Sequence, residues 1–411
     1  MGDADWDVVV IGAGPGGGTA ALHCARLGLR TLILEEHKEI GVPVHCGECL
    51  SEIAVQNLEI ELPENVISLH VKGIRVLFPN NVEKKLTESG YVLEKHLFEQ
   101  WLIDEAVKEG ATFKPSHKVK GLNKNFQLEN QFSNWEITGK GDLFPVTTKI
   151  IIDASGVAGI TSRILNNSNK IEVISGYQYE MIEVENDKYL DFYIWPKYAP
   201  EGYVWMIPKK NGRANVGLVT TKKSEKIKSL DSFIEDTYLS EKKKIDPVWK
   251  KSGMKIKPFG GTIPISGPRN NTIDDGLIMI GDAAGFTSPL FEGGSHLAMK
   301  SGKFAAEVCK EALQKNSFSK NDLSKYETLW KKEFPPYHKI LKGKKALYDL
   351  TDDELAIMAA CMPDEMNGMS IFTKIGVGLK IMIKSPKLIF KKRVISVLLS
   401  FGYSRAKFYG W

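Results

Sequence analysis

Two stretches near the start of the chain decide its fold: DVVVIGAGPGGG at residues 7–18 and TLILE at residues 31–35. An apolar run, a glycine turn, an alanine-rich stretch and a second apolar run predict a strand, a helix and a strand. The glycines let the backbone approach a pyrophosphate at the N-terminus of the helix. Glu35 follows Gly12 by 23 residues, where a carboxylate can bind ribose hydroxyls. The context indicates a dinucleotide-binding unit rather than a turn that binds nothing.

Two later segments repeat the pattern of an apolar run that ends in a turn of small residues. They are IIIDASG at residues 150–156 and GLIMIGDAAG at residues 276–285. Three such motifs in this order resemble the FAD proteins of the glutathione-reductase and hydroxybenzoate-hydroxylase superfamily, whereas an NAD enzyme needs only the first. The resemblance implies that Asp282 binds the ribityl region of FAD, and that the following helix points its positive end at the isoalloxazine.

The composition limits the class of protein. The chain has 411 residues, of which 43% are hydrophobic and 26% are charged, so two or more domains are expected. The acidic residues 1–6 predict no signal peptide, and no run of 18 apolar residues predicts a membrane span. Five cysteines at irregular positions indicate reduced thiols. We therefore expect a cytoplasmic protein, and we expect it to be a monomer without a bound metal.

The C-terminal tail differs in charge from the rest of the chain. Residues 371–411 carry nine basic residues and no acidic one, whereas the remaining 370 residues carry 46 basic and 50 acidic ones. A helical wheel places these apolar residues on one face: Ile371, Phe372, Ile375, Leu379, Met382 and Ile383. This pattern favours peripheral binding to the cytoplasmic membrane surface over nucleic-acid binding. The alternative is that the same face packs on the protein's own core.

The organisation of the chain predicts an α/β protein with a discontinuous nucleotide domain. Helices are expected at residues 91–110 and 295–313, and mainly strands at residues 112–153 and 170–260. We expect a Rossmann-like FAD-binding domain in two parts, residues 1–169 and 261–319. Between these parts lies a mainly antiparallel β-sheet substrate domain at residues 170–260, to which residues 60–90 contribute. A helical C-terminal region follows at residues 320–411.

Two further segments make the resemblance more specific. They are GVPVHCGECLS at residues 41–51, and YVWMIP at residues 203–208 with Gly217 downstream. With the GDAAG motif they resemble geranylgeranyl reductases of the archaeal digeranylgeranylglycerophospholipid type, which carry P-V-R-C-G-E and Y-x-W-x-F-P segments. The resemblance covers roughly residues 5–345.

The resemblance implies a reaction and its partners. The expected enzyme is an FAD-dependent oxidoreductase that reduces isolated C=C bonds of geranylgeranyl chains in isoprenoid ether lipids to saturated, phytanyl-type chains. The hydride comes from N5 of the reduced flavin, and a proton completes the reaction. The sequence has no iron–sulfur spacing and no second G-x-G-x-x-G for NAD(P)H. An external electron donor is therefore expected, either ferredoxin or an NAD(P)H-linked reductant.

The resemblance also implies site residues. Its cofactor contacts, together with the glycine turn, are Gly12, Gly14, Gly16, Gly17, Glu35, Cys46, Gly47, Lys95, Val119, Asp282, Gly294 and Ser295. The candidate catalytic residues are Cys46, Tyr203, Trp205 and His296. Tyr203 and Trp205 are expected to form an apolar wall beside the flavin, although aromatic residues on a strand are commonly core residues. The proton donor is left open among Tyr203, His296 and Cys46.

The chain departs from the family pattern at several positions. His45 and Lys95 stand where arginines are usual, and Cys49 stands where a glycine is usual. The segment PLFEGGSH at residues 289–296 replaces P-x-x-G-[GE]-G-I, which alters the surroundings expected for the flavin ring.

The Cys46–Cys49 pair has three interpretations. It could be a redox dithiol, half of a zinc site, or a reduced Cys46 with a tolerated Cys49. The reduced form is favoured, because the spacing differs from that of disulfide reductases and no second cysteine pair completes a zinc site.

Two other functions fit the same fold. A flavin-dependent monooxygenase or halogenase is one, since halogenases carry W-x-W-x-I-P and only the first Trp is replaced here, by Tyr203. The other is a non-catalytic prenyl-binding escort that has lost its flavin. The presence of Glu35, Asp153 and Asp282 argues against the escort.

Overall fold

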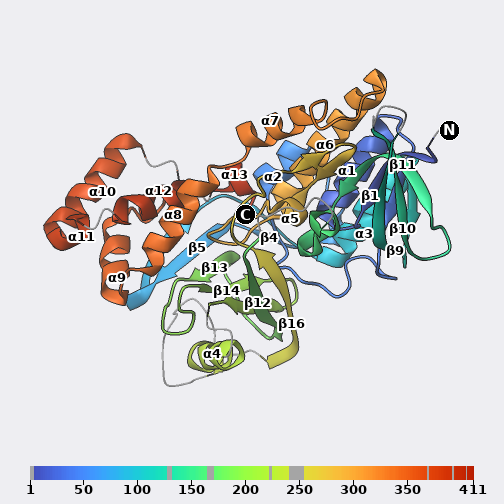
Figure 1. The fold of residues 1–411 in the computed structure, drawn as a ribbon. Coiled ribbons are helices and arrows are strands. Elements are labelled where there is room, and N and C mark those ends of the chain that lie inside the picture. The colour runs from blue at the N-terminus through green and yellow to red at the C-terminus, as the bar shows by residue number, and fades with distance from the viewer. Residues whose placement is uncertain are drawn as a thin grey trace.

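The structure is a computed structural model that describes residues 4–126, 132–163, 171–221, 225–239, 254–367, 370–390, 393–403 and 405–411. Figure 1 shows a sheet with helices α1, α3 and α6 at one end and the helices α9 to α12 at the other. A second sheet lies between these ends, with helix α4 beneath it. The chain returns from the distant helices to the middle of the molecule, where α13 and the C-terminal residue lie.

The first sheet contains the predicted nucleotide-binding unit. Its strands, among the described residues, are β1 (Trp6–Ile11), β2 (Thr31–Leu34), β8 (Thr112–Lys114), β9 (Lys118–Phe126), β10 (Phe132–Lys140), β11 (Val146–Asp153), β17 (Ile273–Asp274) and β18 (Leu277–Met279). The order is β17-β18-β11-β1-β2-β8, and β10 and β9 extend the sheet from β11. The strands β18, β11, β1, β2 and β8 are parallel, which confirms the predicted fold class.

Both faces of this sheet are covered, which explains why β1 is a continuous apolar run. Val8 and Val10 belong to the core cluster that includes the alanines of α1. Val9 and Ile11 point the other way and pack in a cluster with Trp135 of β10. Alternate side chains of one strand therefore stabilise two separate interfaces.

Three helices cover one face: α1 (Pro15–Arg26), α3 (Lys95–Lys108) and α6 (Ser295–Lys315). Small residues allow α1 and α6 to approach closely. A Cβ placed on Gly302 of α6 would lie 2.6 Å from the carbonyl oxygen of Gly16. The predicted helix at residues 295–313 is confirmed.

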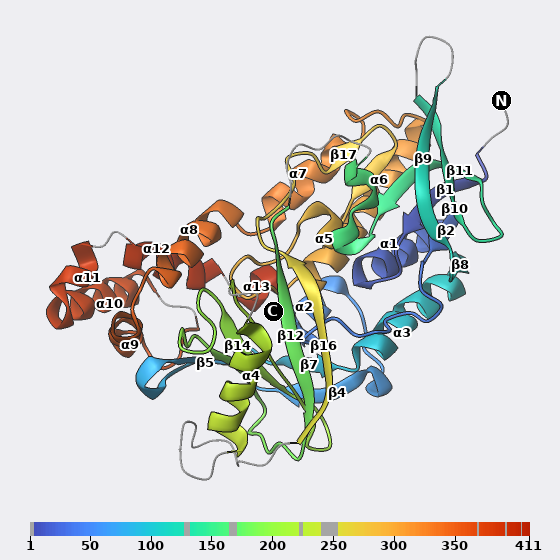
Figure 2. The same ribbon diagram turned by 60° about the horizontal axis from the view of Figure 1, so that its bottom comes forward.

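The second sheet is mainly antiparallel. Its strands, among the described residues, are β5 (Gly73–Phe78), β6 (Val82–Leu86), β12 (Val173–Ile182), β13 (Tyr189–Tyr193), β14 (Tyr203–Pro208), β15 (Ala214–Val219) and β16 (Met254–Pro264). The order is β16-β12-β15-β14-β13-β5-β6, and the pairing of β13 with β5 is parallel. Figure 2 shows β12 and β16 side by side in this sheet. The domain boundaries stay a prediction.

Helix α4 (Lys226–Ile234) was not predicted, because residues 170–260 were expected to be strands. Its Leu230, Phe233 and Ile234 are buried and pack with Val204 and Met206 of β14. The helix therefore covers one face of the second sheet, and the opposite face is available for a site.

The helix predicted at residues 91–110 begins only at Lys95 in the structure. Residues Gly90–Leu93 form β7, which pairs with β3 (Cys49–Ser51) and β4 (Ile67–Val71) in a small third sheet. Glu94 has non-helical dihedral angles, and α3 starts at Lys95. Pairing with two strands outweighs the helical spacing of the apolar residues there. A short helix, α2 (Glu52–Leu58), follows β3.

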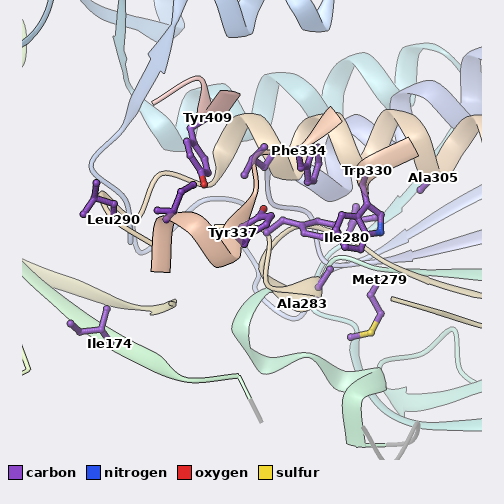
Figure 3. Packing of buried hydrophobic residues seen from close by; sticks show 14 of the residues in the cluster. Ile174, Met279, Ile280, Ala283, Leu290, Ala305, Trp330, Phe334, Tyr337 and Tyr409 are labelled. Carbon is purple, nitrogen blue, oxygen red and sulfur yellow. The ribbon is translucent and has the colours of Figure 1, made fainter. Parts of the chain in front are cut away.

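The C-terminal region is helical, as predicted. Its helices are α7 (Ser324–Glu333), α8 (Tyr337–Tyr348), α9 (Asp352–Cys361), α10 (Ile371–Lys384), α11 (Pro386–Phe390), α12 (Arg393–Tyr403) and α13 (Ala406–Tyr409). Figure 3 shows Trp330, Phe334 and Tyr337 packed near Ile280 and Ala283, at the turn into α5 (Gly281–Ala284). This packing attaches α7 and the start of α8 to the nucleotide-binding sheet.

Helix α10 turns its predicted apolar face outward. Phe372 is 85% exposed and Ile383 is 80% exposed, and Ile375, Leu379 and Met382 are exposed as well. Val377 and Ile381 are buried instead. No helix in the described ranges is long and apolar enough to cross a membrane.

Candidate active site

A cavity of about 1160 Å³ lies between the two large sheets. On one side are the carboxyl ends of the parallel strands, represented by Ile11, Leu34 and Ile280. On the other side is the uncovered face of the second sheet, with Gln178 and Trp205. Ligands of parallel α/β sheets bind at the carboxyl ends of the strands, so the cavity is the expected place for a cofactor.

The glycine turn forms one wall of the cavity. Gly12, Gly14 and Gly16 line it, and a Cβ on Gly14 would meet no atom within 4 Å, so the turn opens directly into the space. Gly12 has a φ of +105°, and a Cβ there would lie 2.4 Å from the carbonyl oxygen of Ala154. Gly17 is not among the lining residues; a Cβ on it would strike the carbonyl oxygen of Gly12. Gly17 therefore shapes the turn.

Glu35 lies at the end of β2 and lines the same end of the cavity. Its Oε2 accepts a hydrogen bond of 2.9 Å from the Ala13 N–H, and its Oε1 accepts one of 2.9 Å from the His37 N–H. The two backbone donors hold the carboxylate in place. Val119 of β9 lines this end as well. An open glycine turn at a helix N-terminus beside a fixed carboxylate fits the adenosine diphosphate part of FAD.

The other end of the cavity is lined by Asp282, Gly294 and Ser295, which lie at the starts of α5 and α6. The Oδ1 of Asp282 accepts a hydrogen bond of 2.9 Å from the Thr287 hydroxyl. Burial raises the pKa of Asp282, and the bond from Thr287 opposes that shift. These residues would hold the ribityl and flavin part of FAD.

Lys95 is buried at the start of α3, and its Nζ pairs with Glu99, four residues later. Burial lowers the pKa of Lys95, but Glu99, Cys46 and Glu48 together raise it by more, so the net shift is upward. Glu99 also lines the cavity and was not predicted. Glu99 follows Lys95 by four residues, and this spacing on a helix predicts that the two side chains pair.

Cys46 and Cys49 are both free thiols. The Glu48 N–H donates to the Cys46 Sγ at 3.2 Å, and the Cys49 thiol contacts the Gly47 carbonyl at 3.6 Å. Burial raises the pKa of the Cys46 thiol, and it raises that of Cys49 further. Both thiols are therefore protonated at neutral pH, and the structure has the reduced form that the sequence favoured.

Glu48 holds the cysteine loop against the second sheet, and its role was not predicted. Its Oε2 accepts hydrogen bonds from Lys209 Nζ at 2.7 Å and from Asn215 Nδ2 at 2.6 Å. Its Oε1 accepts one of 3.0 Å from the Lys95 N–H. These partners lie far from residue 48 in the sequence, and no local pattern indicates them.

The second sheet contributes an aromatic wall. Tyr203, Trp205 and Ile207 alternate along β14 and line the cavity. The ring centroid of Tyr203 lies 5.6 Å from that of Phe192 and 5.6 Å from that of Phe291, and both phenylalanines also line the cavity. Tyr203 and Trp205 are thus brought to the same space as Cys46 and the cofactor residues.

His296 is placed differently from the other candidates. It is fully buried in α6 and is not among the residues that line the cavity. A Cβ on Gly410 would lie 2.5 Å from the Cβ of His296, so the C-terminal segment packs directly on it. Burial lowers the pKa of His296 to about 4.

The C-terminal segment reaches the cavity, which the sequence did not indicate. Tyr409 and Trp411 are lining residues. The carbonyl of Gly410 accepts a hydrogen bond of 2.9 Å from the Ser51 N–H, and Arg405 pairs with Glu88 at 2.7 Å. These contacts hold the end of the basic tail against the site.

The fold and this cavity define an FAD-dependent oxidoreductase, and residues 7–164 match the FAD dependent oxidoreductase family. Residues 172–254, which contain Phe192, Tyr203 and Trp205 of the aromatic wall, match the geranylgeranyl reductase catalytic domain. The chain belongs to the geranylgeranyl reductase family.

Two curated relatives and one solved structure support this assignment. The chain is 35% identical to the digeranylgeranylglycerophospholipid reductase of Methanocaldococcus jannaschii, over 93% of this chain and 96% of the relative. It is 35% identical to the enzyme of the same name from Thermoplasma acidophilum, over 85% of this chain and 89% of the relative. A crystal structure of a geranylgeranyl bacteriochlorophyll reductase-like protein from Thermoplasma acidophilum superimposes with a TM-score of 0.81 at 31% identity, covering 95% of this chain and 99% of that one.

The flavin-dependent brominase Bmp2 is more distant. Its structure superimposes with a TM-score of 0.68 at 18% identity, covering 98% of this chain and 96% of that one. At that identity the likeness shows a shared fold alone. The halogenase alternative therefore gains no support beyond the fold.

Proposed function

We propose that this enzyme reduces the isolated C=C bonds of geranylgeranyl chains in isoprenoid ether lipids, giving saturated, phytanyl-type chains. The observation that carries the proposal is the aromatic wall of Tyr203, Trp205, Phe192 and Phe291, which lies in the same cavity as the cofactor residues. The relatives named digeranylgeranylglycerophospholipid reductase support this choice of substrate.

Bound FAD in its reduced form supplies a hydride to the alkene. The residues of this chain position the alkene and exclude water from it. No electron-withdrawing group activates such an alkene, so close positioning in a dry site is the main contribution that the protein can make. Trp205 is only 8% exposed, and its indole N–H donates to Gln178 Oε1 at 2.8 Å, so its ring presents a fixed apolar surface. The thiol of Cys46 is neutral, so Cys46 is suited to line an apolar site.

The proposal assigns FAD binding to residues 1–169 and 261–319 and substrate binding to residues 170–260 together with residues 60–90. Electrons come from an external donor, either ferredoxin or an NAD(P)H-linked reductant, because the sequence has no second G-x-G-x-x-G.

We further propose that α10 and α12 dock on an anionic membrane surface. Phe372, Ile375 and Ile383 are exposed on α10, and Ile395 is 62% exposed on α12. Lys380, Lys384 and Lys387 are exposed in the same region; Lys391 and Lys392 lie outside the described residues. Exposed apolar side chains interleaved with lysines suit the headgroup region of an anionic bilayer. A lipid with two geranylgeranyl chains lies in that bilayer, so docking shortens its path to the cavity.

An anaerobic turnover experiment tests the reaction. The FAD-loaded protein is reduced with dithionite and mixed with a digeranylgeranylglycerophospholipid, and the product is analysed by mass spectrometry. We expect mass increments of two hydrogen atoms for each reduced bond. Protein kept oxidised is the control. If the lipid mass does not change while the flavin is fully reduced, the proposed reaction is wrong.

A further inference from the structure

Glu292 occupies a backbone position that favours glycine. Its φ is +52°, in the left-handed region, where a side chain is strained. A strained residue that faces a functional cavity is a reason to look for a role of its side chain.

The carboxyl group is buried and faces the cavity. Its side chain is 2% exposed, and Glu292 is one of the lining residues. Oε1 accepts a hydrogen bond of 2.9 Å from Lys344 Nζ of α8. Among the described residues Oε2 has no hydrogen-bond partner of ordinary geometry. One carboxyl oxygen is thus paired with a cation, and the other is buried without a hydrogen-bond partner among the described residues.

Tyr203 lies beside Glu292 but gives its proton elsewhere. Its hydroxyl donates a hydrogen bond of 2.9 Å to the Phe291 carbonyl. A phenol has one proton, so that proton is not shared with Glu292 at the same time. Burial raises the pKa of Tyr203 well above its usual range, and the nearby Glu292 adds to that shift. Tyr203 is therefore a neutral neighbour, which leaves Glu292 as the stronger acid of the two.

We propose that Glu292 supplies the proton for alkene reduction. This inference rests on the proposed function. The hydride forms a C–H bond at one alkene carbon, while the Glu292 O–H bond breaks and its proton forms the C–H bond at the other. The π bond is consumed, reduced FAD is oxidised, and the lipid is reduced by two electrons. The carboxylate that remains is balanced by the Lys344 ammonium, and water protonates it again when the product leaves.

The surroundings suit an acid that is used and restored in each turnover. Among the residues that the structure describes, the titratable groups that interact with Glu292 are Lys344 and Tyr348 of α8 and Tyr203 of β14. Burial raises the pKa of Glu292, whereas Lys344 and the neighbouring Tyr203 hydroxyl oppose the shift. Burial also raises the pKa values of both tyrosines, so neither adds a charge. A proton donor is most effective when its pKa is near the working pH.

The test compares wild type with Glu292→Gln, which keeps the shape but cannot donate a carboxyl proton. Glu292→Gly relieves the backbone strain, so a loss of rate shared by both variants does not reflect misfolding. Glu307→Gln, on the exposed side of α6, is the matched control. In anaerobic single turnovers we expect alkene reduction to slow by at least about a hundredfold in both Glu292 variants, with FAD content unchanged.

A second readout needs no turnover. Infrared titration of the protein without lipid should show a protonated-carboxyl band that is absent in Glu292→Gln. In Lys344→Met the midpoint of this band should move to higher pH, because a cation that favours the carboxylate is gone. A Glu292→Gln variant that is as fast as an active wild type, or a wild type without the band, would overturn the role of Glu292. A wild type that reduces no lipid but shows the band would overturn the proposed function instead.

Discussion

The indole N–H of Trp205 donates a hydrogen bond of 2.8 Å to Gln178 Oε1, and the amide of Gln178 donates one of 2.9 Å to the Cys46 carbonyl. One side chain of β12 therefore connects the aromatic wall to the cysteine loop. Gln178 is only 3% exposed, so both bonds are shielded from water. The wall and the loop are positioned as one unit.

Replacing Gln178 should separate its two contacts. Gln178→Glu keeps an acceptor for Trp205 but loses the donor to the Cys46 carbonyl, whereas Gln178→Leu loses both. Leaving the buried Trp205 N–H unpaired costs about 1–3 kcal/mol, so Gln178→Leu should lower the free energy of unfolding by that amount. Denaturant unfolding measures the stability, and lipid reduction measures the effect on the site. If Gln178→Leu is as stable and as active as wild type, the two hydrogen bonds of Gln178 contribute neither to stability nor to activity.

Trp205→Ala should impair lipid reduction while FAD stays bound, because Trp205 lies on the second sheet and not in the glycine turn. The absorbance of bound FAD per protein and the rate of lipid reduction are the two measurements. Trp135→Ala, in the core of the first sheet, is the control for general destabilisation of the fold. Loss of FAD in Trp205→Ala would instead indicate that this tryptophan is a structural core residue.

Glu35→Gln should weaken FAD binding. Losing a charge-assisted hydrogen bond to the ribose costs about 1.5–3 kcal/mol, which corresponds to an increase in Kd of about ten- to a hundredfold. Titration of FAD-free protein with FAD, followed by flavin fluorescence, gives the Kd. Glu39→Gln, which is exposed and outside the cavity, is the control. An unchanged Kd in Glu35→Gln would show that the carboxylate does not contact the cofactor.

His296 should make stability depend on pH. Burial lowers its pKa to about 4 in the folded protein, against 6.5 for an ordinary, solvated histidine. Between these values the unfolded chain binds more protons, so stability is lost as the pH falls from 6.5 towards 4. The loss from this residue amounts to about 3 kcal/mol. His296→Leu should flatten the slope and keep lipid reduction, because the ring does not line the cavity. An inactive variant that retains FAD would restore His296 as a proton-donor candidate.

Binding to membranes should depend on the exposed face of α10. Phe372→Ser combined with Ile383→Ser should reduce flotation with anionic phospholipid vesicles, and salt should weaken the binding of wild type, since each lysine near the surface contributes about 1 kcal/mol that salt screens. Point substitutions are preferable to removing residues 371–411, because Tyr409 and Trp411 line the cavity. Ile227→Ser, at an exposed position of α4, is the control. If wild type does not float at low salt, the docking proposal is wrong.

The local patterns of the sequence determined the class of fold and the cofactor. A glycine turn between two apolar runs is a short-range signal, because the strand, the turn and the helix are made from neighbouring residues. Glu35 and Asp282, the second of which lies in the GDAAG turn, belong to such patterns, and both line the cavity. The helical C-terminal region and α6 followed from their periodicity in the same way.

The tertiary structure decided everything that depends on residues far apart in the chain. Residues 90–93 form a strand because β3 and β4 pair with them. Glu292 pairs with Lys344 because α8 packs beside the loop that precedes α6. His296 does not line the cavity, because Gly410 packs on it. The sequence shows which face of α10 is apolar, but only packing decides that Val377 and Ile381 are buried while Phe372 and Ile383 face outward. Periodicity reports that a side chain is apolar, whereas its burial depends on which part of the chain lies opposite.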